Sequence, residues 1–413
     1  MGLLIKNIGE LFQVNRGEKK RVSGKEMATL PTIKSAFLLV KDELIEDFGK
    51  MDDCSPDSSH EVVDAQGGSV FPSFCDSHTH LVFADTREEE FEDRIKGLTY
   101  EEIAAKGGGI INSANKLQGM DEDELYRRAA KRLEKIISYG TGAIEIKSGY
   151  GLTPDAELKM LRVARKLGKN YPVEIKTNFL AAHAFPKEFK ENHQGYIDQI
   201  INEMMPKVAE EKLADFVDIF CERGYFSNDE TDQILTAGAK YGMRPKIHVN
   251  QFSISGGIEV ALKHNALSVD HLEVLSDEEI GQLKNSECMP TMLPSCSFFI
   301  KIPFGPARKV IDSGLPLALA TDFNPGSTPS GRMSFVMSLA CIHQNLLPAE
   351  ALNATTLNTA YAMGVEEKMG SIDKGKLASF FITDPIKGLS FIPYSFGDDP
   401  VRRVFLKGKE FKA

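Results

Sequence analysis

The chain of 413 residues lacks paired cysteines. Its six cysteines are scattered, and no two of them stand in a Cys-x-x-Cys arrangement. In a chain of this length, that distribution is typical of free thiols in a reducing compartment. The N-terminal residues also lack the apolar core and the small-residue cleavage site of a signal peptide. We therefore expect a cytoplasmic protein.

Long apolar runs and an excess of basic charge are missing as well. No window approaches the roughly 20 apolar residues that cross a membrane, so we expect no membrane association. The formal net charge is −10, whereas a general nucleic-acid binder needs a basic field. A small anionic substrate remains compatible with this charge, because one well-placed arginine can dominate the local field.

The middle of the chain alternates strand-like runs with amphipathic stretches of helical length. The eight runs are SVFPSFCDSHTH, GAIEIKSGYG, VEIKTNFLAAH, FVDIFCERG, RPKIHVNQF, ALSVDHLE, CMPTMLPS and PLALATDFNPG. Helices are predicted at 121–140, 153–170 and 228–242, and the first and third open with Asp or Asn in the capping position. Eight strands alternating with helices predict an α/β fold, a (β/α)8 TIM-like barrel.

Both ends of the chain differ from this middle. They consist of short β segments separated by turn clusters and irregular stretches, and a chain of this length exceeds one small core. We predict one small β-sandwich domain built from both termini. Its first part spans 1–68, the (β/α)8 barrel spans 69–368, and the second part spans 369–413.

Polar side chains follow the strand-like runs at matching positions. In chain order they are His78 and His80 after the first run, His183 after the third, His248 in the fifth, His271 in the sixth and Asp322 in the eighth. The carboxyl ends of the strands of a (β/α)8 barrel surround the active-site mouth. We therefore expect these six side chains to converge on one rim.

Four of these groups form a predicted metal site. His78 and His80 stand two residues apart on a strand and therefore point the same way. With His248 and Asp322 they make a His3Asp set that suits Zn²⁺ or iron. Water bound to such a metal ionises near neutral pH, and Asp322 can also accept the proton of that water. An isolated His-x-His is weak evidence, so the prediction depends on the four positions together.

Other charged residues have a plainer interpretation. The segment REEEFEDR (87–94) is typical of a solvated helix face, although Arg87 comes only seven residues after His80 and can bind a carboxylate with both guanidinium nitrogens. Lys147 is interpreted as a structural or rim charge. Glu222 ends the fourth run and is either a ligand or a paired rim charge, and the second interpretation is preferred. The remaining histidines are interpreted as surface or satisfied polar residues: His60, His193, His264 and His343.

The motifs HTHLVFADTREEEFEDRIKGLTYEEIAAKGGGI, IEIKSGYGL, FLAAHAFP, DIFCERGYFS, KIHVNQF and ATDFNPGS together closely resemble the imidazolonepropionase family of the amidohydrolase superfamily. The resemblance spans about residues 30–410. REEEFEDR and SGYGL are much more specific to this family than His-x-His is to the superfamily.

The resemblance implies hydrolytic ring opening of 4-imidazolone-5-propanoate to N-formimidoyl-L-glutamate, in the degradation of L-histidine. It implies one Zn²⁺ or Fe²⁺/Fe³⁺ ion per subunit on His78, His80, His248 and Asp322, and it implies a homodimer. It places His271 near the water and the carbonyl group. The implied substrate contacts are Arg87, Tyr150, His183, Gln251, Asn324, Gly326 and Ser327. We expect Asp322 to deliver its proton to the leaving ring nitrogen.

Three alternatives remain open at this point. A deaminase of the same superfamily generally needs a Glu three residues beyond the fifth-strand histidine, where this chain has Gln251. A binuclear enzyme of the dihydroorotase type needs a bridging lysine at the end of the fourth run, which has none. A metal-binding scaffold without activity is the third alternative, and a turnover assay beside metal analysis separates it from an enzyme.

Overall fold

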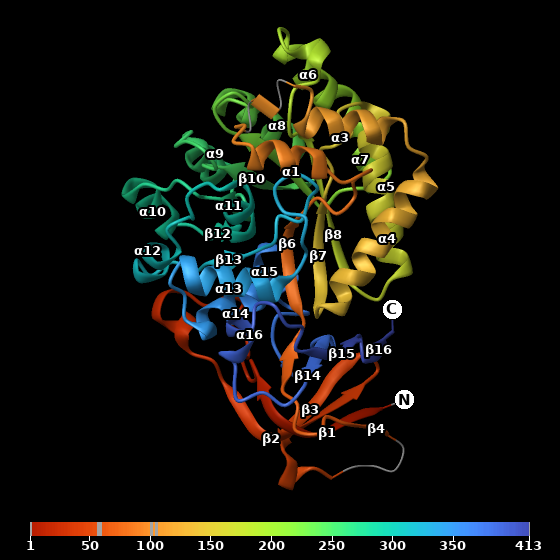
Figure 1. Cartoon of the computed structure of the whole chain (residues 1–413), viewed down its shortest axis with the longest axis vertical. Helices are drawn as coiled ribbons and strands as arrows, with labels where there is room; N and C mark the ends of the chain where they lie inside the picture. Colours follow the sequence, from red (N-terminus) through yellow and green to blue (C-terminus); the bar gives the residue numbers. More distant parts are fainter. Residues whose placement is uncertain (1, 56–59, 100–101, 104–105, 413) are drawn as a thin grey trace.

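The computed structural model describes residues 2–55, 60–99, 102–103 and 106–412. Two sheets organise these residues, and Figure 1 shows the barrel above a smaller sheet near which both chain termini lie. No described helix is both long enough and apolar enough to span a bilayer.

Strands from both ends of the chain form the smaller sheet. They are β1 (Leu3–Phe12), β2 (Thr32–Lys41), β3 (Leu44–Lys50), β4 (Glu61–Asp64), β5 (Val70–Pro72), β14 (Phe380–Thr383), β15 (Val401–Leu406) and β16 (Lys409–Phe411). The strand order is β16-β15-β14-β5-β1-β2-β3, and β4 pairs with β1. The antiparallel pairing of β14 with β5 joins the end of the chain to its beginning. A small β domain built from both termini is therefore confirmed.

The predicted boundary at residue 68 stays a prediction. Strand β5 lies just beyond it and belongs to the small sheet, and it leads almost directly into the first barrel strand. The two sheets therefore share one short connection at this point of the chain.

Eight parallel strands form the barrel. They are β6 (Phe74–Thr79), β7 (Thr141–Lys147), β8 (Glu174–Ala182), β9 (Phe216–Cys221), β10 (Arg244–Val249), β11 (Ser268–His271), β12 (Met289–Met292) and β13 (Ala318–Leu319). They are hydrogen-bonded in chain order from β6 to β13. A parallel bridge between Thr79 and Phe323 brings the last strand segment back to the first, and the Asp322 amide donates to the His78 carbonyl at 3.0 Å. The predicted (β/α)8 fold is confirmed.

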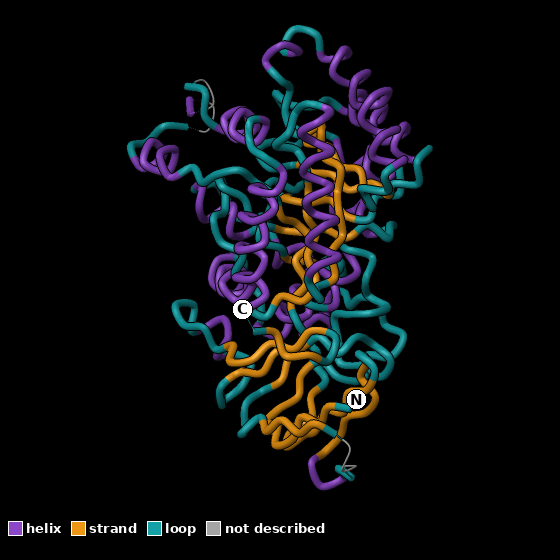
Figure 2. The backbone as a smooth tube through the Cα atoms, turned by 90° about the vertical axis from the view of Figure 1, so that its right-hand side faces the viewer, coloured by secondary structure: helices purple, strands orange, loops and turns teal. Residues whose placement is uncertain are grey.

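Helices follow the barrel strands and surround them (Figure 2). They are α1 (Glu88–Ile95), α3 (Gly109–Gln118), α4 (Glu122–Ser138), α5 (Pro154–Asn170), α6 (His193–Gln199), α7 (Met205–Glu210), α8 (Asn228–Ala239), α9 (Gly257–Lys263), α10 (Asp277–Lys284), α11 (Pro294–Ile300), α12 (Ala307–Asp312), α13 (Met333–His343), α14 (Pro348–Thr355), α15 (Leu357–Ala362) and α16 (Phe391–Tyr394). Short turns lie at η1 (Gly24–Ala28), η2 (Met51–Asp53) and η3 (Lys187–Phe189), and a π-helical turn, η4, spans Ile200–Met204.

The three predicted helices are present as α4, α5 and α8. Asp121 caps α4, because its carboxylate accepts from the backbone amides of Asp123 and Glu124. The cap of α8 differs from the prediction. Ser227, not the following Asn, caps that helix through a reciprocal pair of hydrogen bonds with Glu230.

Candidate active site

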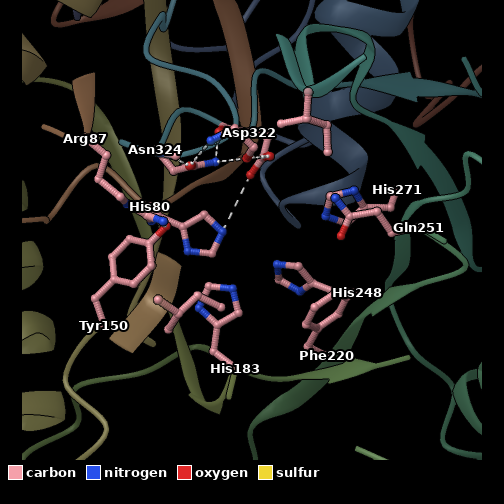
Figure 3. A pocket seen from close by; sticks show the side chains of 14 residues that line it. His80, Arg87, Tyr150, His183, Phe220, His248, Gln251, His271, Asp322 and Asn324 are labelled. Carbon is pink, nitrogen blue, oxygen red and sulfur yellow. Dashed lines mark hydrogen bonds and ion pairs between the residues drawn. The ribbon is translucent and has the colours of Figure 1, made fainter. Parts of the chain in front are cut away.

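The structure brings the six predicted polar groups together at the carboxyl ends of the barrel strands. His80, His183, His248, His271 and Asp322 line one pocket (Figure 3). His78 lies directly beside them, with its ring centroid 4.4 Å from that of His248. All six side chains are buried. The convergence expected from strand-end placement is therefore present.

Two imidazole nitrogens at the centre lack a hydrogen-bond partner in the described part of the chain. They are Nε2 of His78 and Nε2 of His248, both buried. Asp322 Oδ1 lies 3.6 Å from Nε2 of His78 and 3.6 Å from Nε2 of His80. Buried polar atoms without partners are costly. In a tetrahedral zinc site the ligand atoms lie about 3.4 Å apart, since each is about 2.1 Å from the ion. The donor set therefore fits a divalent metal ion.

The protonation states agree with this fit. Burial lowers the pKa of His78 and of His80 well below the ordinary histidine value, and nearby histidines and Lys147 lower each further. Both imidazoles are therefore neutral near pH 7, which is the form that binds a metal. His271 differs. Burial alone would lower its pKa, but Glu273, whose Oε1 lies 3.3 Å from Nδ1, outweighs burial and raises it.

Carboxylates from strands β9 and β11, which flank β10, orient the central imidazoles. Asp270 Oδ2 accepts from Nδ1 of His78 at 2.7 Å, and Asp218 Oδ1 accepts from Nδ1 of His248 at 3.0 Å. Each bond holds the ring proton on Nδ1, so the lone pair of Nε2 is available to a metal ion. Neither aspartate is among the site residues predicted from the sequence. A single Asp inside each apolar run, FVDIFC and SVDH, was the available signal.

The loop after β13 presents Asp322 from a left-handed backbone conformation, with φ of 57°. The side chain of Asn324 holds this loop, because its Oδ1 accepts from the amides of Gly326 at 2.8 Å and Ser327 at 2.7 Å. Ser327 Oγ donates to Asp322 Oδ2 at 2.8 Å. All four residues thus form one hydrogen-bonded turn at the pocket wall. Non-glycine residues adopt such a backbone conformation mainly at functional sites and turns.

Arg87 reaches the pocket from the start of α1, on the side opposite His271 (Figure 3). Its Nη2 donates to the Tyr150 hydroxyl at 3.2 Å, and Nη1 lies 3.6 Å from Glu90. Arg87 is the only lysine or arginine among the residues that line the pocket. The guanidinium packs closely on Gly326. A Cβ atom added to Gly326 would lie 2.6 Å from Cζ of Arg87.

The remaining predicted contacts also line this pocket. His183 Nδ1 lies 3.1 Å from the Gly149 carbonyl, and its ring stacks on His80 with centroids 4.9 Å apart. Gly149 has a φ of 104°, and a Cβ there would lie 2.9 Å from His183 Nδ1, so the close packing requires glycine. The Gln251 amide donates to Cys296 Sγ at 3.5 Å. Tyr150, His183 and Gln251 lie in the pocket wall as expected.

Several site residues were not foreseen. The pocket has apolar walls from Ile110, Phe220 and Ile300, and an apolar side chain at a loop or strand gives no sequence signal for a binding role. Of the two roles predicted for Lys147, structural or rim, the structure shows the structural one, because its side chain is fully buried and paired with Glu145 and Asp218. Glu222 accepts from the amides of Phe252 and Ser253 and does not line the pocket.

Three of the four histidines interpreted as outside the site lie elsewhere with partners of their own. His193 pairs with Glu230 at 3.0 Å, and His264 pairs with Asp232 at 2.7 Å. His343 stacks on Phe304, with ring centroids 4.3 Å apart. His60 directly precedes β4 of the small sheet and does not line the pocket.

Comparison with known proteins agrees with this geometry. The model of the amidohydrolase family matches residues 69–411. An imidazolonepropionase of Flavobacterium johnsoniae is 57% identical over 98% of this chain and 99% of its own length. Among solved structures, a triazine hydrolase variant has a TM-score of 0.76 at 14% identity, covering 99% of this chain and 94% of its own. A zinc-bound adenosine deaminase from Xanthomonas campestris has a TM-score of 0.73 at 16% identity, covering 99% and 92%.

At such low identity the two solved structures show a shared fold and nothing more. The curated relative is different, since it matches along nearly the whole of both chains. The chain therefore belongs to the amidohydrolase family and, within it, to the imidazolonepropionases.

Proposed function

We propose that the chain hydrolyses the ring amide of 4-imidazolone-5-propanoate and releases N-formimidoyl-L-glutamate, a step of L-histidine degradation. One observation carries this proposal. A single pocket holds a cluster of buried imidazoles with one aspartate on one side and a guanidinium on the other. The cluster suits amide hydrolysis, and the guanidinium suits the carboxylate of the propanoate chain.

His78, His80, His248 and Asp322 are the proposed ligands of one zinc or iron ion per subunit. Their donor atoms lie within 4.8 Å of one another in overlapping groups. Both metals accept nitrogen and carboxylate ligands. When bound, the ion supplies Lewis acidity, which polarises a carbonyl and lowers the pKa of water.

The chain's own residues supply the remaining steps. We assign Arg87 to the substrate carboxylate, and Tyr150, His183 and Gln251 to the polar atoms of the ring. Asp322 takes a proton from the attacking water. The water oxygen bonds to the carbonyl carbon, and the ring carbon–nitrogen bond then breaks.

Two groups manage charge and protons during this change. His271, whose pKa is raised beside Glu273, can donate a hydrogen bond to the oxyanion that develops on the carbonyl oxygen. Asp322 hands its proton to the leaving ring nitrogen. The other proposed substrate contacts are Asn324, Gly326 and Ser327, which lie on the same hydrogen-bonded turn as Asp322.

A direct assay tests the function. Purified protein incubated with 4-imidazolone-5-propanoate is expected to consume the imidazolone absorbance and yield formimidoylglutamate by mass spectrometry. Dialysis against a chelator should abolish turnover, and added Zn²⁺ or Fe²⁺ should restore it. A metal-loaded protein that leaves the imidazolone intact but deaminates an aminoheterocycle would favour the deaminase alternative. Bound metal with neither activity would favour the scaffold.

Replacing Gly326 by Ala should weaken substrate binding. The new Cβ would lie 2.6 Å from Cζ and Nη1 of Arg87, which forces the guanidinium out of its position. This displacement should raise KM on the order of tenfold and change kcat less. The reason is that the substrate carboxylate is bound equally well in the ground state and the transition state. Steady-state kinetics measure this split.

The control for this variant is Gly281→Ala on α10, where an added Cβ meets no atom within 4 Å. It should leave both kinetic constants unchanged. An unchanged KM in Gly326→Ala would contradict the assignment of Arg87 to the substrate carboxylate.

We also propose a cytoplasmic homodimer, as the family resemblance implies. Light scattering of the purified protein tests the dimer, and a mass of one chain across the working concentration range would rule it out.

A further inference from the structure

A cluster of buried charged side chains, joined by one asparagine, lies in the barrel beneath the pocket. Its members share complete or nearly complete burial and come from five neighbouring strands: Glu145 and Lys147 on β7, Asn178 on β8, Asp218 on β9, Lys246 on β10 and Asp270 on β11. Buried ions cost several kcal/mol each unless they are well paired. A cluster of this size inside a barrel core therefore needs a reason beyond stability.

Lys147 is the centre of this cluster. Its Nζ donates to Glu145 Oε1 at 2.6 Å and to Asp218 Oδ2 at 2.8 Å, and it lies 3.7 Å from Asp270 Oδ2. Asn178 donates to Glu145 and Asp218 as well, at 2.8 and 2.9 Å. One ammonium thus contacts both aspartates that orient the central imidazoles.

The path from this ammonium to the pocket has two branches. One runs through Asp218 to Nδ1 of His248, and the other through Asp270 to Nδ1 of His78. The opposite nitrogens of these two rings are the buried Nε2 atoms that have no partner among the described residues. Among the three histidines proposed as metal ligands, His78 and His248 are the two whose Nδ1 atoms bond to a described carboxylate. The lysine is linked to both of them.

We propose that Lys147 is a positioning residue for the metal ligands. Its ammonium fixes the carboxylates of Asp218 and Asp270, and these hold His78 and His248 with Nε2 turned to the common centre. The proposal rests on the metal site of the proposed function. It assigns a role to a residue that touches neither the metal nor the substrate.

Lys246 provides a matched control. It is as buried as Lys147 and also pairs with Glu145. Its other partners are the carbonyls of Ser77 at 3.0 Å and Ala362 at 3.2 Å, and it approaches Asp270 only at 3.9 Å. Loss of Lys246 removes a buried charge from the same cluster without releasing Asp218.

The test compares Lys147→Met and Lys246→Met as metal-free proteins whose folding is verified by circular dichroism and urea unfolding. Zinc affinity is measured by competition with a chromophoric chelator. We expect Lys147→Met to bind Zn²⁺ about tenfold to a hundredfold more weakly than wild type, the usual effect of losing an outer-shell partner. Lys246→Met should stay within about threefold of wild type, even if both variants lose stability.

A second readout does not depend on zinc. In metal-free wild-type protein with ¹⁵N-labelled histidine, two ring signals should show a proton on Nδ1 held in a strong hydrogen bond. These signals should be lost or shifted in Lys147→Met and kept in Lys246→Met. If Lys147 had a purely structural role, Lys147→Met would not change these two signals more than Lys246→Met does.

The outcomes separate this inference from the proposed function. A wild-type protein that binds no zinc would refute the metal site itself. Tight zinc binding by wild type and equally tight binding by Lys147→Met would overturn the positioning role alone. If Lys147→Met fails to fold, Lys147→Gln replaces it. Failure of both variants, beside a folded Lys246→Met, would assign the lysine to the fold and also overturn the proposal.

Discussion

Replacing Asp322 by Asn is expected to reduce kcat by about three orders of magnitude, within the range for loss of general acid–base catalysis. The amide cannot take the proton of the attacking water or pass it to the leaving nitrogen. The backbone at this position has a φ of 57°, a conformation that Asn adopts as readily as Asp. The substitution therefore changes the chemistry of the group with little change in the loop. Stopped assays of formimidoylglutamate measure the loss.

Metal content decides how this result is interpreted, because Asp322 is also a proposed ligand. The variant is therefore assayed after metal loading, with the bound ion quantified in the same sample. Asp232→Asn is the matched control, since that carboxylate pairs with His264 and Lys263 outside the pocket and should keep normal turnover. Near-normal turnover of a folded, metal-loaded Asp322→Asn protein would rule out the proton-transfer role.

Replacing Arg87 by Met is expected to lower kcat/KM about a hundredfold. Among the described residues that line the pocket, the guanidinium is the only lysine or arginine cation, and a hydrogen-bonded charge pair in a buried site contributes about 3 kcal/mol. Most of the loss should appear in KM, because the carboxylate lies away from the reacting bond. An imidazolone without the carboxylate should react equally slowly with both proteins.

Arg94→Met is the control for this prediction. Arg94 lies on the same helix, α1, with its Cζ 5.8 Å from the ring centroid of Phe299, and it does not line the pocket. Its loss should leave kcat/KM close to wild type. Equal losses in both variants would indicate that α1 matters for the fold and that Arg87 has no specific contact with the carboxylate.

The fold could be predicted from the sequence because its signals are local. Each barrel strand is a short apolar run bounded by turn residues, and five of the eight runs carry one of the six predicted rim side chains at or near their ends. The rule that carboxyl ends of parallel strands share one rim then places His78, His183 and His271 together without any knowledge of distances. The resemblance to a known family added the substrate to this geometry.

The supporting residues could not be found in this way. In a barrel both faces of a strand are buried, so alternation does not say which charged residue faces the axis. Asp270 is 192 residues from His78 in the chain and 2.7 Å from it in space, and no local pattern connects the two. For the same reason Lys147 was interpreted as a possible rim charge.

The chain by itself therefore determined the eight strands, the order in which they alternate with helices, the imidazoles and the aspartate near the strand ends, and the guanidinium that follows the first strand. These features follow from residue type and spacing, which act over one turn or one strand. The tertiary structure alone decided which nitrogen of each ring faces the centre, that Gly326 makes room for Arg87, and that one buried ammonium links two aspartates beneath the pocket. Those features depend on contacts between distant segments, which exist only after the barrel has closed.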